Sequence, residues 1–247
     1  MIALDIKNLN KTFITTSGFF KKRIFKKKVL DNCSIQIKSG EIFGLAGLNG
    51  IGKTTMIKII LDLLKPNSGE INIFNVSNQN HVVRKNICYL PEKFLPSQYL
   101  TGYEFLDLYL SFFNKKLDKN EANKLAKDID LDSSVLSQTI KKYSKGMAQK
   151  LGLLYCLLSN AKILILDEPM TGLDPKTRVI LKKSLKSYAK KGNTIFFSSH
   201  ILDDIEEICD KMAVLDDGKI KFNGTPQEFR EKYQEYTIEK SFLKCIQ

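Results

Sequence analysis

The sequence lacks the features that define several common protein classes. It has only two histidines, and its five cysteines are scattered without a C-x-x-C pair. Neither a zinc site nor a disulfide framework is therefore expected, and buried, reduced thiols are the default. No uncharged apolar run approaches the roughly 20 residues needed to span a bilayer, and Asp5 and Lys7 interrupt any signal-peptide core at the N-terminus. We therefore expect a soluble, cytoplasmic chain.

Acidic residues are also scarce relative to basic ones. The 247 residues include 27 Asp and Glu against 39 Lys and Arg, which gives a formal net charge of +12. This excess implies acidic partners such as nucleotide, anionic lipid headgroups or nucleic acid, and charge alone does not choose among them. Six of the eight residues 21–28 are basic. A solvated loop, a patch against an anionic membrane surface and a nucleic-acid contact all remain open for this run.

The strongest motif occupies nine consecutive residues: Gly47, Leu48, Asn49, Gly50, Ile51, Gly52, Lys53, Thr54 and Thr55. It matches the pattern of glycine, four residues and Gly-Lys-Thr, between a strand-like and a helix-like apolar run, as a phosphate-binding loop requires. Glycine accepts positive φ, so backbone N–H groups can converge on a phosphate where the helix starts. Lys53 would reach the β- and γ-phosphates, and the Thr54 hydroxyl would ligate Mg²⁺. The sequence therefore predicts binding of a nucleoside triphosphate.

Two adjacent carboxylates, Asp167 and Glu168, follow the short apolar run 163–166. Such a run, bounded by charge, is typical of a central parallel strand. Ligands bind at the carboxyl ends of parallel strands. Asp167 can hold Mg²⁺ there, and Glu168 can accept a proton from the water that attacks the γ-phosphate. The alternative is a solvated pair of carboxylates at a strand end.

The character of the chain changes between residues 101 and 158. Apolar residues recur there at helical spacing without any strand signal, which predicts a helical subdomain inserted in an α/β core. Asp174-Pro175 is typical of a helix start. Strands are expected around 2–6, 29–37, 71–73, 87–90, 163–166, 194–198, 213–215 and 220–222.

With these motifs the chain resembles the ATPase subunit of an ATP-binding cassette (ABC) transporter, nearly end to end. Residues 143–147 lie where that family carries its signature sequence, and residues 170–174 resemble the loop after the catalytic carboxylate. Residues 199–200 resemble the histidine switch, and residues 91–92 fall at the loop that senses the γ-phosphate. Phe13 sits where an aromatic ring stacks on adenine, although a place in the core is the open alternative.

The resemblance implies the ABC ATPase fold, which is a P-loop NTPase α/β core with an antiparallel β subdomain and an inserted helical subdomain. One nucleotide-binding domain, 1–247, is expected. Its α/β core would comprise residues 1–92 and 159–224, its helical subdomain residues 93–158, and its short C-terminal segment residues 225–247.

The resemblance also implies roles for individual residues. Glu168 would be the catalytic base, and His200 would orient the water. Two copies would hold each ATP between the phosphate loop of one and the Ser144 loop of the other, where Ser144 and the Gly146 N–H begin a helix. The remaining nucleotide contacts would be Phe13, Glu92 and Asp174. The Mg²⁺ ligands would be Thr54, Asp167 and Glu92.

Some positions depart from the usual family pattern. Tyr143, Lys145 and Met147 replace the usual Leu, Gly and Gln of the signature, and Glu92 replaces a Gln. An ionised Glu92 accepts hydrogen bonds but donates none. These departures are similar to a branch of exporters whose permease is of the ABC-2 type, and the tail 236–243 is also similar to that branch.

The implied partners are an integral membrane permease and a second ATPase subunit, either another copy or a related chain. The implied location is cytoplasmic and peripheral, on the inner face of the cell membrane, and no specific nucleic acid is expected. The alternative is a soluble ABC-type ATPase that acts on nucleic acid or the ribosome, which the net charge would suit. The insert is too short for the coiled coil of DNA-repair members, and ribosome-associated members normally carry two cassettes in one chain. The cargo is not indicated.

Overall fold

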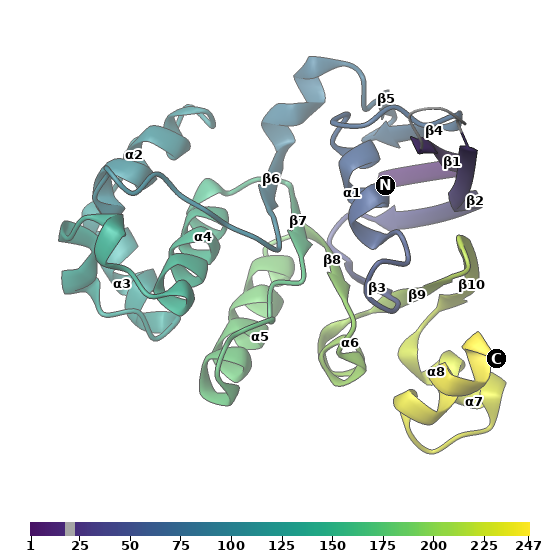
Figure 1. Ribbon diagram of the computed structural model, residues 1–247. Coiled ribbons are helices and arrows are strands. Elements are labelled where there is room, and N and C mark those ends of the chain that lie inside the picture. The colour runs from purple at the N-terminus through teal and green to yellow at the C-terminus, as the bar shows by residue number, and fades with distance from the viewer. Residues whose placement is uncertain (18–22) are drawn as a thin grey trace. The chain divides into compact units, whose positions relative to one another are not determined.

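The structure, a computed structural model, describes residues 1–17 and 23–247. It divides into two compact units, one comprising Met1–Arg84 with Ser198–Gln247 and the other Lys85–Phe197 (Figure 1). The chain returns from the second unit to the first within strand β8 (Thr194–Ser199). Residues 21–22 of the basic run lie outside the described residues.

The first unit contains a four-stranded antiparallel sheet in the order β2-β1-β4-β5. Its strands are β1 (Ile2–Ser17), β2 (Arg23–Lys38), β4 (Ser68–Ile73) and β5 (Val76–Ser77). Leu4 pairs with Ile37 and Ile6 with Ile35. All four side chains are buried, and such cross-strand aliphatic pairs stabilise the sheet and its register. The antiparallel sheet expected from the resemblance is therefore confirmed.

Strands β1 and β2 stay paired beyond the rest of this sheet. Pairing of β1 with β4 ends at Asn10 and Ser68, whereas pairing with β2 continues to Ser17 and Arg23. A loop over residues 23–28 is therefore ruled out, because this segment is strand. The facing segment 12–15 consists of β-branched and aromatic residues, which favour a strand, and pairing with it makes the lysine-rich segment a strand as well.

A parallel strand pair carries the nucleotide motif in the first unit. Strand β3 (Ile42–Ala46) pairs in parallel with β9 (Lys211–Asp216), which pairs antiparallel with β10 (Lys219–Gly224). Every residue of β3 is buried. The helices of this unit are α1 (Lys53–Ile60), α6 (Leu202–Ile208), α7 (Pro226–Tyr233) and α8 (Ile238–Ile246), and the 3₁₀ helix η1 (His81–Asn86) reaches the boundary.

The second unit combines buried strands with helices. Strands β6 (Ile87–Leu90) and β7 (Ile163–Asp167) pair in parallel, and β7 is buried throughout. The helices are α2 (Gly102–Ser111), α3 (Lys119–Asp128), α4 (Lys145–Ser159) and α5 (Pro175–Lys190), with the 3₁₀ helices η2 (Ser133–Ser137) and η3 (Ile140–Lys142). The helical content predicted between 101 and 158 is confirmed. None of the helices in the described part of the chain has the length and apolar character to cross a membrane.

The cysteines match the expectation of reduced thiols. All five are free, four of them buried and Cys209 half-buried. Cys88 and Cys156 are the only pair whose thiols form a hydrogen bond with each other among the described residues, with 3.4 Å between the Sγ atoms. Burial raises the pKa of the Cys156 thiol well above its ordinary value, which keeps this thiol protonated.

Candidate functional site

The phosphate-loop motif forms the turn between β3 and α1. Gly50 and Gly52 have φ of 77° and 129°, values that L side chains rarely adopt. Gly52 caps α1 without a side-chain hydrogen bond, so the first N–H groups of the helix face whatever lies at its N-terminus. Residues 48–50 are exposed. The turn is thus an open cradle of backbone donors, which fits the phosphates of a nucleotide.

Lys53 bends back over this turn. Its side chain is buried, and its Nζ donates to the Gly47 carbonyl at 2.6 Å and the Leu48 carbonyl at 3.2 Å. Backbone carbonyls therefore hold the ammonium beside the cradle. Thr54, half-buried, is the next residue of α1. The predicted loop, Gly47 to Thr55, is brought together as one structural element.

The loop rests on strand β2 at Gly52. A Cβ placed on Gly52 would lie 2.9 Å from the Val29 carbonyl oxygen and 2.9 Å from Val29 Cγ1. Real Cβ atoms rarely come so close to backbone, so both the φ angle and the contact require glycine. A Cβ on Gly50 would meet nothing within 4 Å.

The second unit gathers carboxylates at one edge. In the register of β6 and β7, Leu90 pairs with Leu166, so Asp167 ends β7 beside the end of β6, and Glu92 lies two residues past that end. Tyr89 of β6 responds to both carboxylates. Its pKa is raised to about 12, mainly by burial and further by the negative charges of Asp167 and Glu92. The structure therefore places these two predicted Mg²⁺ ligands at neighbouring strand ends, with Tyr89, which belongs to no sequence motif, within reach of the charge of both.

Glu168 has an unusual backbone conformation. Its φ is 52°, a value uncommon for a residue with a side chain, and its side chain is buried. Thr171 Oγ1 donates to Glu168 Oε2 at 3.4 Å. Strained, buried residues of this kind concentrate at functional sites.

Ser144 and Gly146 begin α4. Ser144 is the N-cap, and its Oγ accepts a hydrogen bond from the Met147 N–H at 3.2 Å. A Cβ on Gly146 would meet only Ser144 Oγ, at 4.0 Å. Packing within the described chain therefore does not require a glycine at 146, and its missing side chain leaves the N-terminal end of α4 open to an approaching ligand.

The remaining predicted residues have different surroundings. Asp174 caps α5, since its carboxylate accepts from the Thr177 N–H at 2.9 Å and from Thr177 Oγ1 at 2.6 Å. These hydrogen bonds, that of the Thr177 hydroxyl first, lower the pKa of Asp174.

His200 is exposed at the end of the buried strand β8. Phe13 lies in β1, 39% exposed, with Lys11 Nζ 5.2 Å from its ring centroid. This exposure makes the core alternative for Phe13 wrong.

The predicted residues therefore fall in both units. Phe13, the phosphate loop and His200 belong to the first, and the others, all in the second, are Glu92, Ser144, Gly146, Asp167, Glu168 and Asp174. No cluster of three or more His, Cys, Asp or Glu side chains suited to a metal occurs among the described residues. Mg²⁺ needs no such cluster, because it is commonly bound by one or two carboxylates together with substrate phosphates.

Comparison with known proteins decides the family. A family model described as ABC transporter matches residues 30–171. The chain belongs to the ABC transporter family. It is 33% identical over 235 residues to an uncharacterized ABC transporter ATP-binding protein of Nostoc sp., covering 94% of this chain and 69% of that protein. It is 31% identical over 232 residues to the Nod factor export ATP-binding protein I of Rhizobium etli, covering 92% and 70%.

A solved structure agrees with this assignment. The chain matches a structure described as an ATP-binding subunit of an ABC transporter, with a TM-score of 0.83, 28% identity and coverage of 98% of this chain and 99% of the other. The ABC ATPase fold expected from the sequence is therefore confirmed. So is the prediction that this ABC protein is an ATP-binding, ATP-hydrolysing transporter subunit.

Proposed function

We propose that this ABC protein is the ATPase of an exporter, and that it drives a separate membrane permease, of the ABC-2 type, from the inner face of the membrane. The partner ATPase is a second copy or a related chain. In the expected subdivision of the domain, residues 93–158 form the helical subdomain that meets the permease. The export assignment is supported by likeness to a protein named for Nod factor export.

The main support for a permease contact is the exposure of large apolar side chains. Large apolar side chains lie exposed in the loop after Glu92 and on α2: Leu95 and Tyr99 are 89% and 94% exposed, and Leu108 and Phe112, at the end of the helix, are 49% and 68% exposed. Phe94 packs edge-on against Phe105 of α2, with 5.7 Å between ring centroids. This contact fastens the loop after Glu92 to the helix. Exposed large apolar side chains that follow Glu92 in the chain support docking of a protein partner.

In the proposed mechanism two subunits close around two ATP molecules. The loop at Gly52 and Lys53 cradles the phosphates of one subunit's ATP, while the open N-terminus of α4 at Ser144 of the other subunit approaches the same nucleotide. Phe13 stacks on the adenine, and Asp174 orders the loop after Glu168. ATP shifts the subunits toward closure only by the affinity that it gains in the closed state.

Hydrolysis then reopens the pair of subunits. Thr54, Asp167 and Glu92 are the residues that would hold Mg²⁺, which supplies charge neutralisation at the phosphates. Glu168 takes the proton from the attacking water, and His200 orients that water by donating to a γ-phosphate oxygen. Because Glu168 is buried, few bulk water molecules can compete with it for the proton of the attacking water.

Affinity purification from detergent-solubilised membranes tests the proposed partner. A tagged copy of this chain should bring down a polytopic membrane protein, because the apolar surface near Glu92 would otherwise face water. Recovery of only nucleic acid or ribosomal proteins, with nothing from the membrane fraction, would instead support the soluble-ATPase alternative.

A double substitution tests the docking surface. We expect Leu108→Ser with Phe112→Ser to reduce recovery of the permease about tenfold or more, because two partly buried apolar contacts are lost. ATP hydrolysis by the isolated subunit should not change. The matched control is Val82→Ser with Val179→Ser, which removes side chains that are 54% and 47% exposed elsewhere. Equal loss of permease in both variants would contradict the assignment.

A second pair of variants tests the role of Ser144. Ser144 caps α4 and Thr101 caps α2, and each accepts a backbone N–H at 3.2 Å. Alanine at either position should cost about 1 kcal/mol of unfolding free energy. Only Ser144→Ala should also weaken ATP-dependent dimerisation, by about tenfold, because it removes a donor to a charged phosphate. Denaturant unfolding and sedimentation with ATP measure the two effects. If Thr101→Ala weakens the dimer equally, the Ser144 contact is wrong.

A further inference from the structure

Apart from Phe13, one end of the β1–β2 hairpin has a composition that the nucleotide site does not explain. We name residues 12–15 and 25–28 the basic arm. Within the described residues, β1 pairs with β4 only as far as Asn10, and beyond that point it pairs with β2 alone. Two-stranded ribbons are only marginally stable by themselves in water. We propose that the basic arm binds the anionic lipid headgroups of the membrane surface.

Both faces of the basic arm expose apolar side chains. Ile14 is 64% exposed, Phe25 56% and Phe13 39%. Because successive side chains of a strand point to opposite faces, Phe13 and Ile14 lie on opposite sides of the ribbon. Neither face is therefore buried against a core. Large apolar side chains exposed on both faces of one short ribbon indicate an interaction site.

Lysines accompany these apolar side chains across the ribbon. Phe13 is paired with Lys27, and Ile14 with Lys26, so on each face a lysine stands beside an apolar group. Residues 11–28 include no Asp or Glu. Among the described residues, neither Lys26 nor Lys27 forms an ion pair, whereas Lys28 bonds to Asp31. The two lysines nearest the apolar groups are thus available to an external anion.

This combination fits a bilayer surface better than a nucleic acid. Anionic headgroups attract lysines, each worth about a fivefold gain in binding. Directly below the headgroups lies hydrocarbon, which takes up apolar side chains such as Ile14. A nucleic acid would attract the lysines and could stack on Phe25, but an aliphatic side chain gains less there than in hydrocarbon, because its insertion between bases costs unstacking energy. The proposed function places this chain beside a membrane, and the inference rests on that function only for this location.

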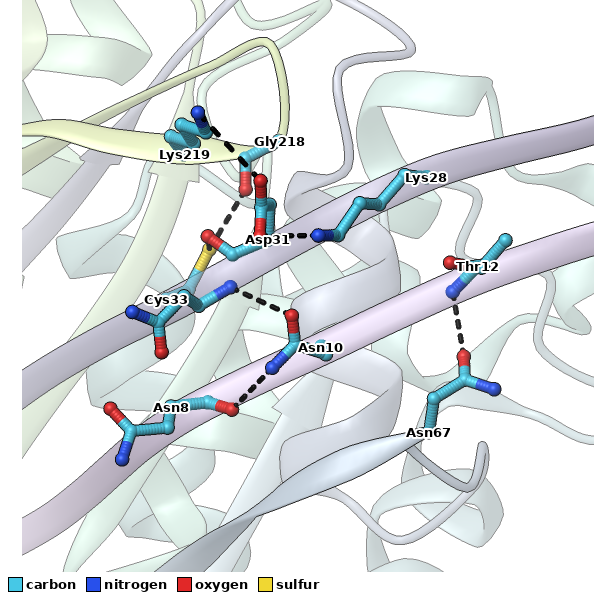
Figure 2. Close-up of polar contacts among 10 residues, drawn as sticks. Asn8, Asn10, Thr12, Lys28, Asp31, Cys33, Asn67, Gly218 and Lys219 are labelled. Carbon is cyan, nitrogen blue, oxygen red and sulfur yellow. Dashed lines mark hydrogen bonds and ion pairs between the residues drawn. The ribbon is translucent and has the colours of Figure 1, made fainter.

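The root of the arm is fixed to the body of the first unit. Figure 2 shows Lys28 beside Asp31, whose carboxylate also faces Lys219 at 3.7 Å. The Asp31 N–H donates to the Gly218 carbonyl at 2.7 Å, and Cys33 Sγ donates to the same oxygen at 3.0 Å. These bonds fasten β2 to the β9–β10 turn. A bound arm would therefore hold the whole first unit at the membrane instead of moving as a loose tether.

Vesicle flotation of the full chain tests the proposal. The probe is a vesicle of phosphatidylcholine and phosphatidylglycerol in equal parts, compared with phosphatidylcholine alone, without permease or ATP. We expect binding to the anionic vesicles only. Lys26→Gln with Lys27→Gln should lower the partition coefficient about 30-fold, and Ile14→Thr with Phe25→Thr about tenfold. Thermal unfolding of each variant checks that the fold is intact.

A matched variant distinguishes binding by the lysines of the arm from a general effect of the protein's net charge. Lys186→Gln with Lys190→Gln removes the same charge from exposed positions of α5 and should leave the partition within about twofold of the native value. Equal losses from both lysine pairs, an unchanged partition for Ile14→Thr with Phe25→Thr, or binding to phosphatidylcholine alone would each overturn the proposal. Tighter binding to a single-stranded oligonucleotide, lost with Lys26 and Lys27, would assign the arm to nucleic acid. Because the assay contains no permease, its failure leaves the proposed function standing.

Discussion

Replacement of Glu168 by Gln is expected to reduce steady ATP hydrolysis about 10³-fold while ATP still binds. Gln keeps the shape of the buried side chain but cannot accept the proton of the attacking water. Since hydrolysis is what reopens the proposed pair of subunits, the variant should accumulate as an ATP-bound dimer. Phosphate release measures the first effect, and size-exclusion chromatography with ATP measures the second.

The control for this variant changes charge but not the site. Glu70→Gln makes the same chemical change at a side chain that is 64% exposed, and it should hydrolyse ATP at the native rate. Turnover near the native rate in Glu168→Gln would remove Glu168 as the base. Hydrolysis lost together with ATP binding would mean that Glu168 holds the nucleotide instead of acting on water.

Gly52→Ala should be the most damaging single change in the phosphate loop. The new Cβ meets the Val29 carbonyl at 2.9 Å, and φ at this position is 129°. Backbone strain and overpacking each cost roughly 1–3 kcal/mol, so we expect about 4 kcal/mol of lost unfolding free energy. A displaced cradle should also lower kcat/KM about 100-fold. Denaturant unfolding and ATPase kinetics measure these losses.

Gly50→Ala is the matched comparison within the same loop. Its φ of 77° is also left-handed, but a Cβ there would meet nothing within 4 Å. Only the conformational cost remains, which is about 1–2 kcal/mol. If both variants lose the same unfolding free energy, the close contact with Val29 adds no cost, and the positive φ angles explain the whole loss.

The parts of the site that were predictable are those with a local signal. The phosphate loop has a fixed spacing between a strand and a helix, and Asp167 follows a short apolar run, bounded by charge, that is typical of a buried strand. Asp174 and Pro175 begin α5 as their chemistry requires. In each case the pattern and the structure depend on neighbours within about ten residues, so the sequence alone contains the information.

Features set by distant neighbours were not predictable. A lysine-rich segment favours a loop by composition, and residues 23–28 become strand only because β1 extends alongside them. Tyr89 stands out only when β6 and β7 are paired, since its pKa responds to Asp167 and Glu92. The open space around Gly146 is likewise a property of the folded chain and not of the residue type.

The long hairpin also has a consequence for hydrogen exchange. Along strand β2, Ile35 is buried and pairs with Ile6 of β1, which is itself paired with β4, whereas Lys26 pairs with Ile14, beyond the part of β1 that β4 covers. Local opening costs least where few buried contacts are lost. Backbone amides of one continuous strand should therefore exchange over a wide range of rates, slow near Ile35 and fast near Lys26. A surface that immobilises the arm would slow the fast end alone, and deuterium uptake measured by mass spectrometry would report the arm's occupancy without an attached probe.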